Sequence, residues 1–243
     1  MLVFALFLLV IGTERVMLSE RWPQLDGVRR RWNHWSPKAK AYMRSAPGTF
    51  TYLFVLVITT WVLQTSSSKI ANELLLARST NLHHLFGDPM RVLFGSAFWV
   101  SSGEELLFTI LIFSLIVAQV ERWLGTARTV VIFFLGHVGA TVIVALWLWA
   151  SLNFTYVKSP ITNAQDVGAS YGFAALAAIL AFRISLPRRW LYITVVLAIA
   201  GIDLTLEPSF TNWGHAIAVA LGFISYFFIP RRFRIRRLAS EVQ

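Results

Sequence analysis

Cysteine is absent from this 243-residue chain, and charged residues make up only 14% of it. Without cysteine, the chain forms no disulfide and has no thiolate metal site and no cysteine nucleophile. Soluble domains average about 25% charged residues, whereas here 56% of all residues are hydrophobic. The scarcity of charge therefore excludes a soluble globular protein, and the high apolar content excludes a disordered or collagen-like chain.

The hydrophobic residues are gathered into six long blocks that contain no Asp, Glu, Lys or Arg. Such blocks are typical of membrane spans, because about 20 helical residues cross a bilayer core of roughly 30 Å. They comprise residues 48–68, 106–120, 129–157, 167–182, 190–202 and 208–230. The pattern predicts an all-α polytopic membrane protein with six transmembrane helices.

Lys and Arg are distributed unevenly between the segments that connect these blocks. Taken alternately, one set of segments carries 18 basic residues and the other carries 4. The positive-inside rule places the richer set, which includes both termini, in the cytoplasm. We therefore assign the net charge of +10 to a membrane surface and expect anionic lipid, not nucleic acid, as the partner at the cytoplasmic face.

The blocks divide the chain into a basic, Trp-containing segment (1–47), a six-helix membrane domain (48–230) and a basic tail (231–243). Met1–Gly12 is apolar but spans only about 18 Å as a helix, which is too short to cross a bilayer. No basic residue precedes it and no clear cleavage site follows, so we do not expect a signal peptide. The remainder of 1–47 is either an interfacial lipid anchor or a binding arm for a cytoplasmic partner.

Polar side chains within a membrane are costly, so each one is a candidate functional residue. Two of them, Ser170 and His215, fall at similar depths below the outer ends of the fourth and sixth blocks. Both lie among glycine and alanine spaced so that two helices can approach closely. A serine and a histidine on such helices can form a nucleophile–base pair. The full set is Glu104, Glu105, His137, Asp166, Ser170, Asp203 and His215.

The other polar residues indicate simpler roles. We expect His137 and Asp203 to form hydrogen bonds within the bundle. The sequence contains no His-Glu-x-x-His pattern and no histidine pair three or four residues apart, so we expect no metal and no cofactor.

The motifs around these residues resemble those of the rhomboid intramembrane serine proteases, over roughly residues 49–230. The Gly-x-Ser string at the start of the fourth block is similar to the family's nucleophile motif, and the small-residue pattern around His215 is similar to its histidine motif. The segments that carry the resemblance are Glu121–Gly125, Gly168-Ala169-Ser170, Gly214-His215 with Ala218 and Gly222, and Arg91 in the first loop.

This chain departs from the family at several positions. Tyr171 follows the serine where glycine is usual, and Ala174 stands where an aromatic residue commonly packs on the catalytic histidine. Met90 replaces the tryptophan before Arg91. Counted back from Glu121, the family's oxyanion-stabilising His-x-x-x-Asn pair corresponds to Glu105 and Thr109. A threonine hydroxyl can donate a hydrogen bond, whereas a carboxylate donates only when protonated.

The resemblance implies a multi-pass protein of a bacterial plasma membrane that cleaves membrane-protein segments. Ser170 and His215 would be the catalytic residues, with oxyanion or auxiliary roles for Thr109, Glu105 and Gly168. The rival interpretation is a pseudoprotease that binds membrane-protein clients without cleaving them. A transporter is disfavoured, because no inverted repeat or broken helix pair is visible.

Overall fold

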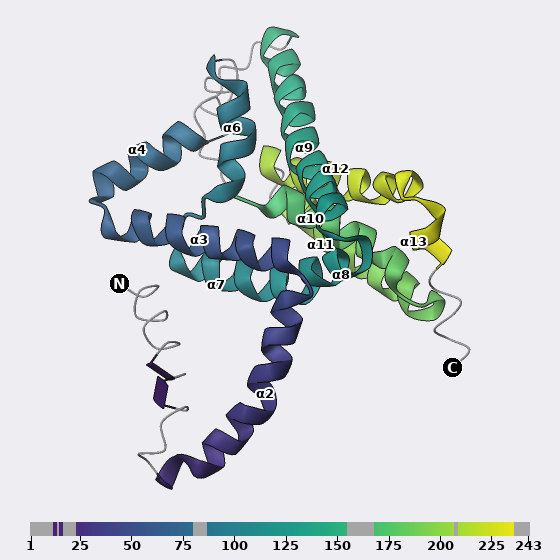
Figure 1. The fold of residues 1–243 in the computed structure, drawn as a ribbon. Helices are drawn as coiled ribbons and strands as arrows, with labels where there is room; N and C mark the ends of the chain where they lie inside the picture. The colour runs from purple at the N-terminus through teal and green to yellow at the C-terminus, as the bar shows by residue number, and fades with distance from the viewer. Residues whose placement is uncertain are drawn as a thin grey trace.

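The computed structural model describes residues 12, 13, 15, 16, 23–79, 87–154, 168–206 and 209–235 of the chain. The predictions about residues 1–11, Asp166 and residues 236–243 lie outside these ranges. Every regular element in the described part is a helix (Figure 1), which confirms the all-α class. The α-helices are α2 (Asp26–Arg44), α3 (Pro47–Thr65), α4 (Ser68–Arg78), α6 (Pro89–Gly95), α7 (Gly103–Ile112), α8 (Ala118–Leu124), α9 (Thr126–Phe154), α10 (Ser170–Leu180), α11 (Leu186–Leu206), α12 (Phe210–Ser225) and α13 (Arg231–Ile235).

Short turns of other helix types extend several of these elements. Four 3₁₀ turns are described: η1 (Pro23–Leu25), η2 (Ser96–Phe98), η5 (Ala181–Arg183) and η6 (Tyr226–Phe228). One element, η3 (Phe113–Val117), is a π-helical segment that joins α7 to α8. The stretch from Gly103 to Leu124 is thus one continuous span with a π segment near its middle.

The described part of each apolar block is mostly helical, but the helices differ in length. Four are long and apolar enough to cross a membrane: Pro47–Thr65, Gly103–Leu124, Thr126–Ser151 and Leu186–Leu206. The fourth and sixth blocks form shorter helices, α10 with η5 and α12 with η6. Many large apolar side chains on the long helices are exposed, including Phe108 and Leu115 on α7–η3 and Leu191 on α11. A lipid environment accommodates such faces, whereas water does not.

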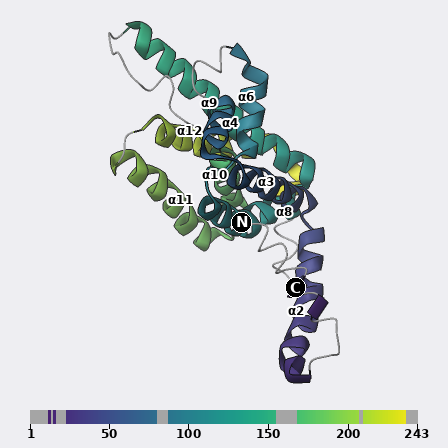
Figure 2. The same ribbon diagram turned by 90° about the vertical axis from the view of Figure 1, so that its left-hand side faces the viewer.

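The short helix α10 lies at the centre of the bundle and packs most closely against α9 and α12 (Figures 1 and 2). Eight of its eleven residues are buried. Glycine makes the close packing possible: a methyl group at Gly222 of α12 would overlap the backbone of Ala175, and one at Gly136 of α9 would overlap the Ala175 side chain. The small residues thus bring the helix that carries Ser170 and the helix that carries His215 backbone to backbone.

Glu121 fixes the reversal between the second and third spans. Its buried carboxylate accepts hydrogen bonds from the Gly48 and Thr49 amides at 2.8 and 2.7 Å, and from the Thr49 and Thr126 hydroxyls, both at 2.6 Å. The chain then turns at Gly125, whose φ of 82° favours glycine. The last turn of α8 and Gly125 therefore form this reversal, and the Glu121 carboxylate also caps the start of α3.

α2 precedes this bundle and projects away from it in both views (Figures 1 and 2). None of its residues is buried. It carries six basic residues and one acidic residue, Asp26. This composition suits a helix whose surroundings are polar or interfacial.

Candidate active site

Ser170 is the first residue of α10, and the backbone before it is shaped by Gly168. Gly168 has a φ of 130°, and its N–H donates a hydrogen bond of 3.0 Å to the Ser96 carbonyl in η2. Only glycine adopts this φ without strain. The turn leads directly into α10, with the Ser170 side chain exposed and lining a cavity.

His137 supports this turn from α9. Its Nε2 atom lies 3.0 Å from the Ser96 hydroxyl, and both side chains are buried. Ser96 therefore links His137 to Gly168, because its hydroxyl pairs with the imidazole and its carbonyl accepts the Gly168 N–H. The expectation that His137 is a hydrogen-bonding residue of the bundle is confirmed.

His215 lies in the second turn of α12. The Ser209 hydroxyl caps this helix by accepting the Asn212 N–H at 3.2 Å. The Tyr171 ring meets the His215 ring edge to face, with 5.1 Å between centroids. It fits there because residue 214 is glycine, and a methyl group at that position would overlap the tyrosine ring. Tyr171 therefore supplies the aromatic contact with His215 that Ala174 cannot make.

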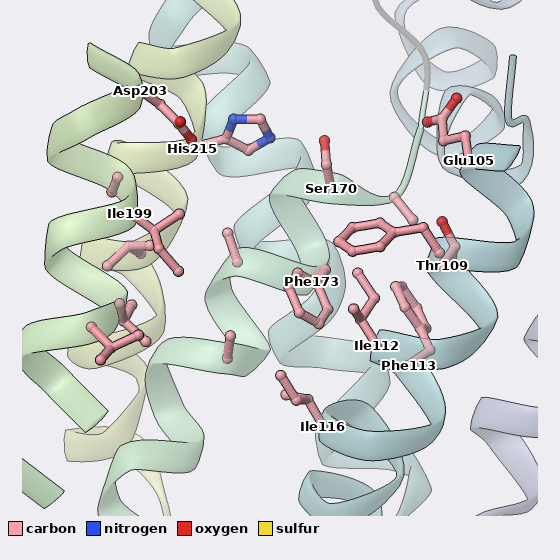
Figure 3. A pocket seen from close by; sticks show the side chains of 18 of the residues that line it. Glu105, Thr109, Ile112, Phe113, Ile116, Ser170, Phe173, Ile199, Asp203 and His215 are labelled. Carbon is pink, nitrogen blue, oxygen red and sulfur yellow. The ribbon is translucent and has the colours of Figure 1, made fainter. Parts of the chain in front are cut away.

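A cavity of about 610 Å³ opens between α7, α10, α11 and α12, and four of the predicted site residues line it: Glu105, Thr109, Ser170 and His215. In Figure 3, the Ser170 hydroxyl and the His215 ring point into the same space from neighbouring helices. Thr109 and Glu105 contribute to the opposite wall from α7. Among the residues that the structure describes, no hydrogen bond joins Ser170 to His215. The deeper walls are apolar and include Ile112, Ile116 and Ile199.

The Glu105 carboxylate makes a hydrogen bond that the sequence analysis did not predict. One carboxylate oxygen accepts the Ser101 N–H at 3.0 Å, while the Ser102 hydroxyl accepts the Glu105 N–H at 3.1 Å. Together the two bonds cap the start of α7 in a variant of the capping box, in which the carboxylate accepts the N–H of the residue before the cap. The Ser-x-x-Glu spacing in the sequence is the signal that predicts it. Thr109 is buried one turn further along α7.

Two other residues differ from their sequence interpretation. Arg91, which resembles the arginine of the family's first-loop motif, is exposed on α6 and does not line the cavity. Asp203, predicted only as a hydrogen-bonding residue, lies on the cavity wall near the end of α11. Its carbonyl accepts a hydrogen bond from the Asn212 side chain at 3.1 Å. Within the described residues, no group of three or more His, Asp or Glu side chains is placed to hold a metal ion.

Comparison with known proteins gives one result. A family model described as "Rhomboid-like protein" matches residues 41–234, which is most of the chain. The chain belongs to the rhomboid-like family. No curated protein and no solved structure matches it. The family and the apolar helices together make this rhomboid-like chain an integral membrane protein.

Proposed function

We propose that this rhomboid-like protein is an intramembrane serine protease in which Ser170 and His215 form the catalytic dyad. One observation carries the proposal: the two side chains enter the same cavity from α10 and α12 (Figure 3), which glycine holds in close contact. A nucleophile and its base need this arrangement on rigid, adjoining elements.

The chemistry follows from the two side chains. The Ser170 oxygen attacks the substrate carbonyl carbon while His215 takes the hydroxyl proton. The tetrahedral intermediate collapses, the C–N bond breaks, and His215 returns the proton to the leaving amine. A water molecule, deprotonated by His215, then hydrolyses the acyl-enzyme and regenerates the Ser170 hydroxyl. For this proton transfer the Ser170 hydroxyl and the His215 ring must come within hydrogen-bond range, and in apo sites such bonds commonly tighten only when substrate binds.

Two donors are available for the oxyanion. The Ser170 N–H lies in the first turn of α10, where amides have no intrahelical partner, and among the described residues no side chain caps this helix at Ala169. The Thr109 hydroxyl faces the same cavity from α7 (Figure 3). Of the oxyanion or auxiliary roles predicted for Gly168, the auxiliary one is favoured, because its N–H is bonded to the Ser96 carbonyl. Its auxiliary role is to shape the turn that presents Ser170.

The cavity walls indicate the substrate class. Side chains deep in the cavity are aliphatic or aromatic, whereas the acidic and hydroxyl groups Glu105, Asp203 and Ser170 gather at one end (Figure 3). An apolar membrane segment suits the deep walls, and water can reach the polar end. Because a carbonyl within a regular helix is already hydrogen-bonded, small helix-breaking residues near the cleaved bond favour cleavage.

A pseudoprotease that binds membrane-protein clients is the second candidate. It is favoured by the absence of a Ser170–His215 hydrogen bond within the described residues, and by Glu105, a carboxylate in the wall that the oxyanion would face. Such a protein would use the same cavity to hold a membrane segment. The two candidates differ in whether Ser170 is a reactive nucleophile.

A fluorophosphonate probe decides between them. We expect the purified protein in detergent to be labelled at Ser170, and the label to be lost in Ser170→Ala and His215→Ala. Ser66→Ala, at the end of α3 and outside the cavity lining, serves as the matched control and should label like the parent. Folded parent protein that takes up no label and cleaves no model membrane segment would establish the pseudoprotease.

We also infer that six helices cross the membrane with both termini in the cytoplasm. The basic imbalance of 18 to 4 supports this topology. Single cysteines can be introduced into the cysteine-free chain. Cysteines at Ser66 and Thr162 should react with an impermeant thiol reagent on intact cells, whereas one at Ser240 should react only after lysis. The opposite pattern would refute the topology.

The same imbalance supports a membrane-surface role for the basic segments. We propose that α2, with its six basic residues, lies against anionic lipid on the cytoplasmic side of a bacterial plasma membrane. Vesicle binding by the full chain in nanodiscs should then increase with the fraction of anionic lipid and decrease with salt. Binding that is insensitive to both would argue for a protein partner instead.

A further inference from the structure

Asp203 approaches His215 from a helix that carries neither dyad residue. It lies in the last turns of α11, and its carbonyl is held by the Asn212 side chain at 3.1 Å. Asn212 precedes His215 by three residues on α12, so both residues lie on the same side of that helix. The Asn212 bond thus pins the end of α11 beside the face of α12 that carries His215.

The side chains of Asp203, His215 and Ser170 lie in this spatial order along the polar end of the cavity. In Figure 3, the His215 ring lies between the Asp203 carboxylate and the Ser170 hydroxyl. One ring nitrogen is on the side of Ser170, and the other is on the side nearer Asp203. All three residues line the same cavity.

Charged and titratable groups approach His215 from four helices. Asp203 approaches from α11, Tyr171 packs edge-on from α10, and His137 of α9 lies behind Tyr171 with 6.2 Å between their rings. Glu105 of α7 lies on the far wall and is already bonded to the Ser101 amide. Asp203 is therefore the acid on the histidine side of the cavity.

The Asp203 carboxylate makes no hydrogen bond or ion pair with any other described residue. A carboxylate at the edge of an apolar cavity is stabilised by a nearby cation or hydrogen-bond donor. The imidazole of His215 can be either one, depending on its protonation. The remaining interpretation is a solvated acid at the end of a helix, which would leave the properties of His215 unchanged.

We propose that Asp203 is a positioning residue that orients His215 by accepting a hydrogen bond from its Nδ1–H, directly or through one water molecule. This interaction leaves Nε2 unprotonated and facing Ser170, which is the form that a general base requires. It also stabilises the imidazolium once His215 holds the serine proton. The catalytic consequence rests on the proposed protease function, whereas the coupling between Asp203 and His215 does not.

The first experiment measures the histidine itself, in the full chain in detergent. Nitrogen NMR of ¹⁵N-histidine-labelled protein distinguishes the Nδ1–H from the Nε2–H tautomer, and His215→Gln assigns the signal. We expect the Nδ1–H tautomer in the parent. Asp203→Asn should shift the population toward Nε2–H, because an amide can present its own N–H to Nδ1. Asp203→Glu should restore the parent tautomer in part.

The second experiment measures cleavage of a model membrane segment. Asp203→Asn should lower kcat by about 10²-fold or more while KM stays within about twofold, since the misprotonated ring no longer accepts the serine proton. Asp203→Glu should recover part of this loss. Glu104→Gln is the matched control, because Glu104 is an exposed acid in the first turn of α7 that does not line the cavity.

The outcomes separate this inference from the proposed function. An Asp203-dependent tautomer in a protein that never labels at Ser170 would uphold the coupling and refute the protease. Normal cleavage by Asp203→Asn, with an unchanged His215 tautomer, would refute the positioning role and leave the dyad intact.

Discussion

The helices α7 and α10 both begin beside the same cavity, but side chains cap the start of only one of them. At α7, the Ser102 hydroxyl accepts the Glu105 N–H of the first turn, and the Glu105 carboxylate accepts the Ser101 N–H just before the helix. At α10, Ala169 offers no side-chain cap, and the described residues supply none. Side chains cap one helix start, while at the other the described residues leave the Ser170 amide without a side-chain cap.

This difference suggests that the start of α7 serves mainly the stability of the fold, whereas the start of α10 serves the reaction. A capped helix start gains about 1 kcal/mol because its orphan amides are paired. An uncapped start forgoes this stabilisation but keeps N–H donors for an incoming negative charge. The turn before Ser170 is secured from outside instead, by the Ser96 carbonyl that accepts the Gly168 N–H. We therefore expect substitutions at α10 to affect activity most, and substitutions at α7 to affect mainly stability.

The largest effect should come from the uncapped helix start itself. Ser170→Ala, His215→Ala and the double variant should each reduce cleavage to background, with no further loss in the double variant, because a nucleophile and its base act as one unit. Cleavage of a model membrane segment in proteoliposomes measures this. Circular dichroism and thermal unfolding should match the parent. Substantial turnover by either single variant would contradict the dyad.

A second large effect should follow from replacing the glycine that forms the turn before Ser170. Gly168→Ala should destabilise the protein by about 1–3 kcal/mol, because alanine is strained at a φ of 130°. The cause is the backbone, since the added methyl group would meet Glu105 only at an ordinary 3.6 Å. A shift of about 1 Å at Ser170 would also reduce cleavage by about 10²-fold.

Gly201→Ala provides the control for Gly168. Gly201 lies within α11, where a methyl group would enter open space. Alanine there should be neutral or stabilise by up to about 1 kcal/mol. Equal unfolding temperatures for the two variants would show that the turn before Ser170 is not under backbone constraint.

A smaller effect is expected at the capped helix start. Ser102→Ala removes the hydroxyl that accepts the Glu105 N–H and should cost about 1 kcal/mol of stability. Ser102→Thr keeps an acceptor and should recover most of it. Fluorophosphonate labelling of Ser170 should persist in both variants. Loss of labelling in a folded Ser102→Ala protein would show that the cap also serves the reaction.

The smallest effect concerns the charge on Glu105. Glu105→Gln keeps an oxygen that can accept the Ser101 N–H but removes the negative charge from the cavity wall. If that charge repels the oxyanion by about 1 kcal/mol, cleavage at neutral pH should rise roughly fivefold. Glu104→Gln should leave the rate unchanged. A sharp loss of activity in a folded Glu105→Gln protein would mean that the carboxyl group assists the reaction.

Sequence patterns predicted the positions of the helices well, because a helix needs about 20 apolar residues to cross a membrane. The ends of the helices were less predictable. The expected block 190–202 is too short, since α11 begins at Leu186 and includes Arg188 and Arg189. Long basic side chains can extend toward the polar interface, so arginine does not end a helix in a membrane. Glu104 and Glu105 likewise lie inside α7, where acids favour a first turn.

The candidate site was partly predictable for a related reason. Ser170 and His215 were found because local motifs surround each of them. The contacts of Tyr171 with His215, and of His137 with Ser96, join residues 41 or more positions apart. No single-sequence pattern encodes such pairs, since they depend on how α9, α10 and α12 pack. Asp203 was placed at the cavity only by the packing of α11 against α12.

The π segment η3 has a consequence for the angular register of the second span. A regular α-helix turns by about 100° per residue, whereas a π segment absorbs one extra residue without that rotation. Thr109 before η3 lines the cavity, while Glu121 after it points to the start of α3. A regular helix of the same length would rotate one of these residues away from its partner. Deleting one residue from η3 would therefore give a regular helix in which Thr109 and Glu121 still face their partners. Inserting one more residue would rotate Glu121 by about 100° relative to Thr109.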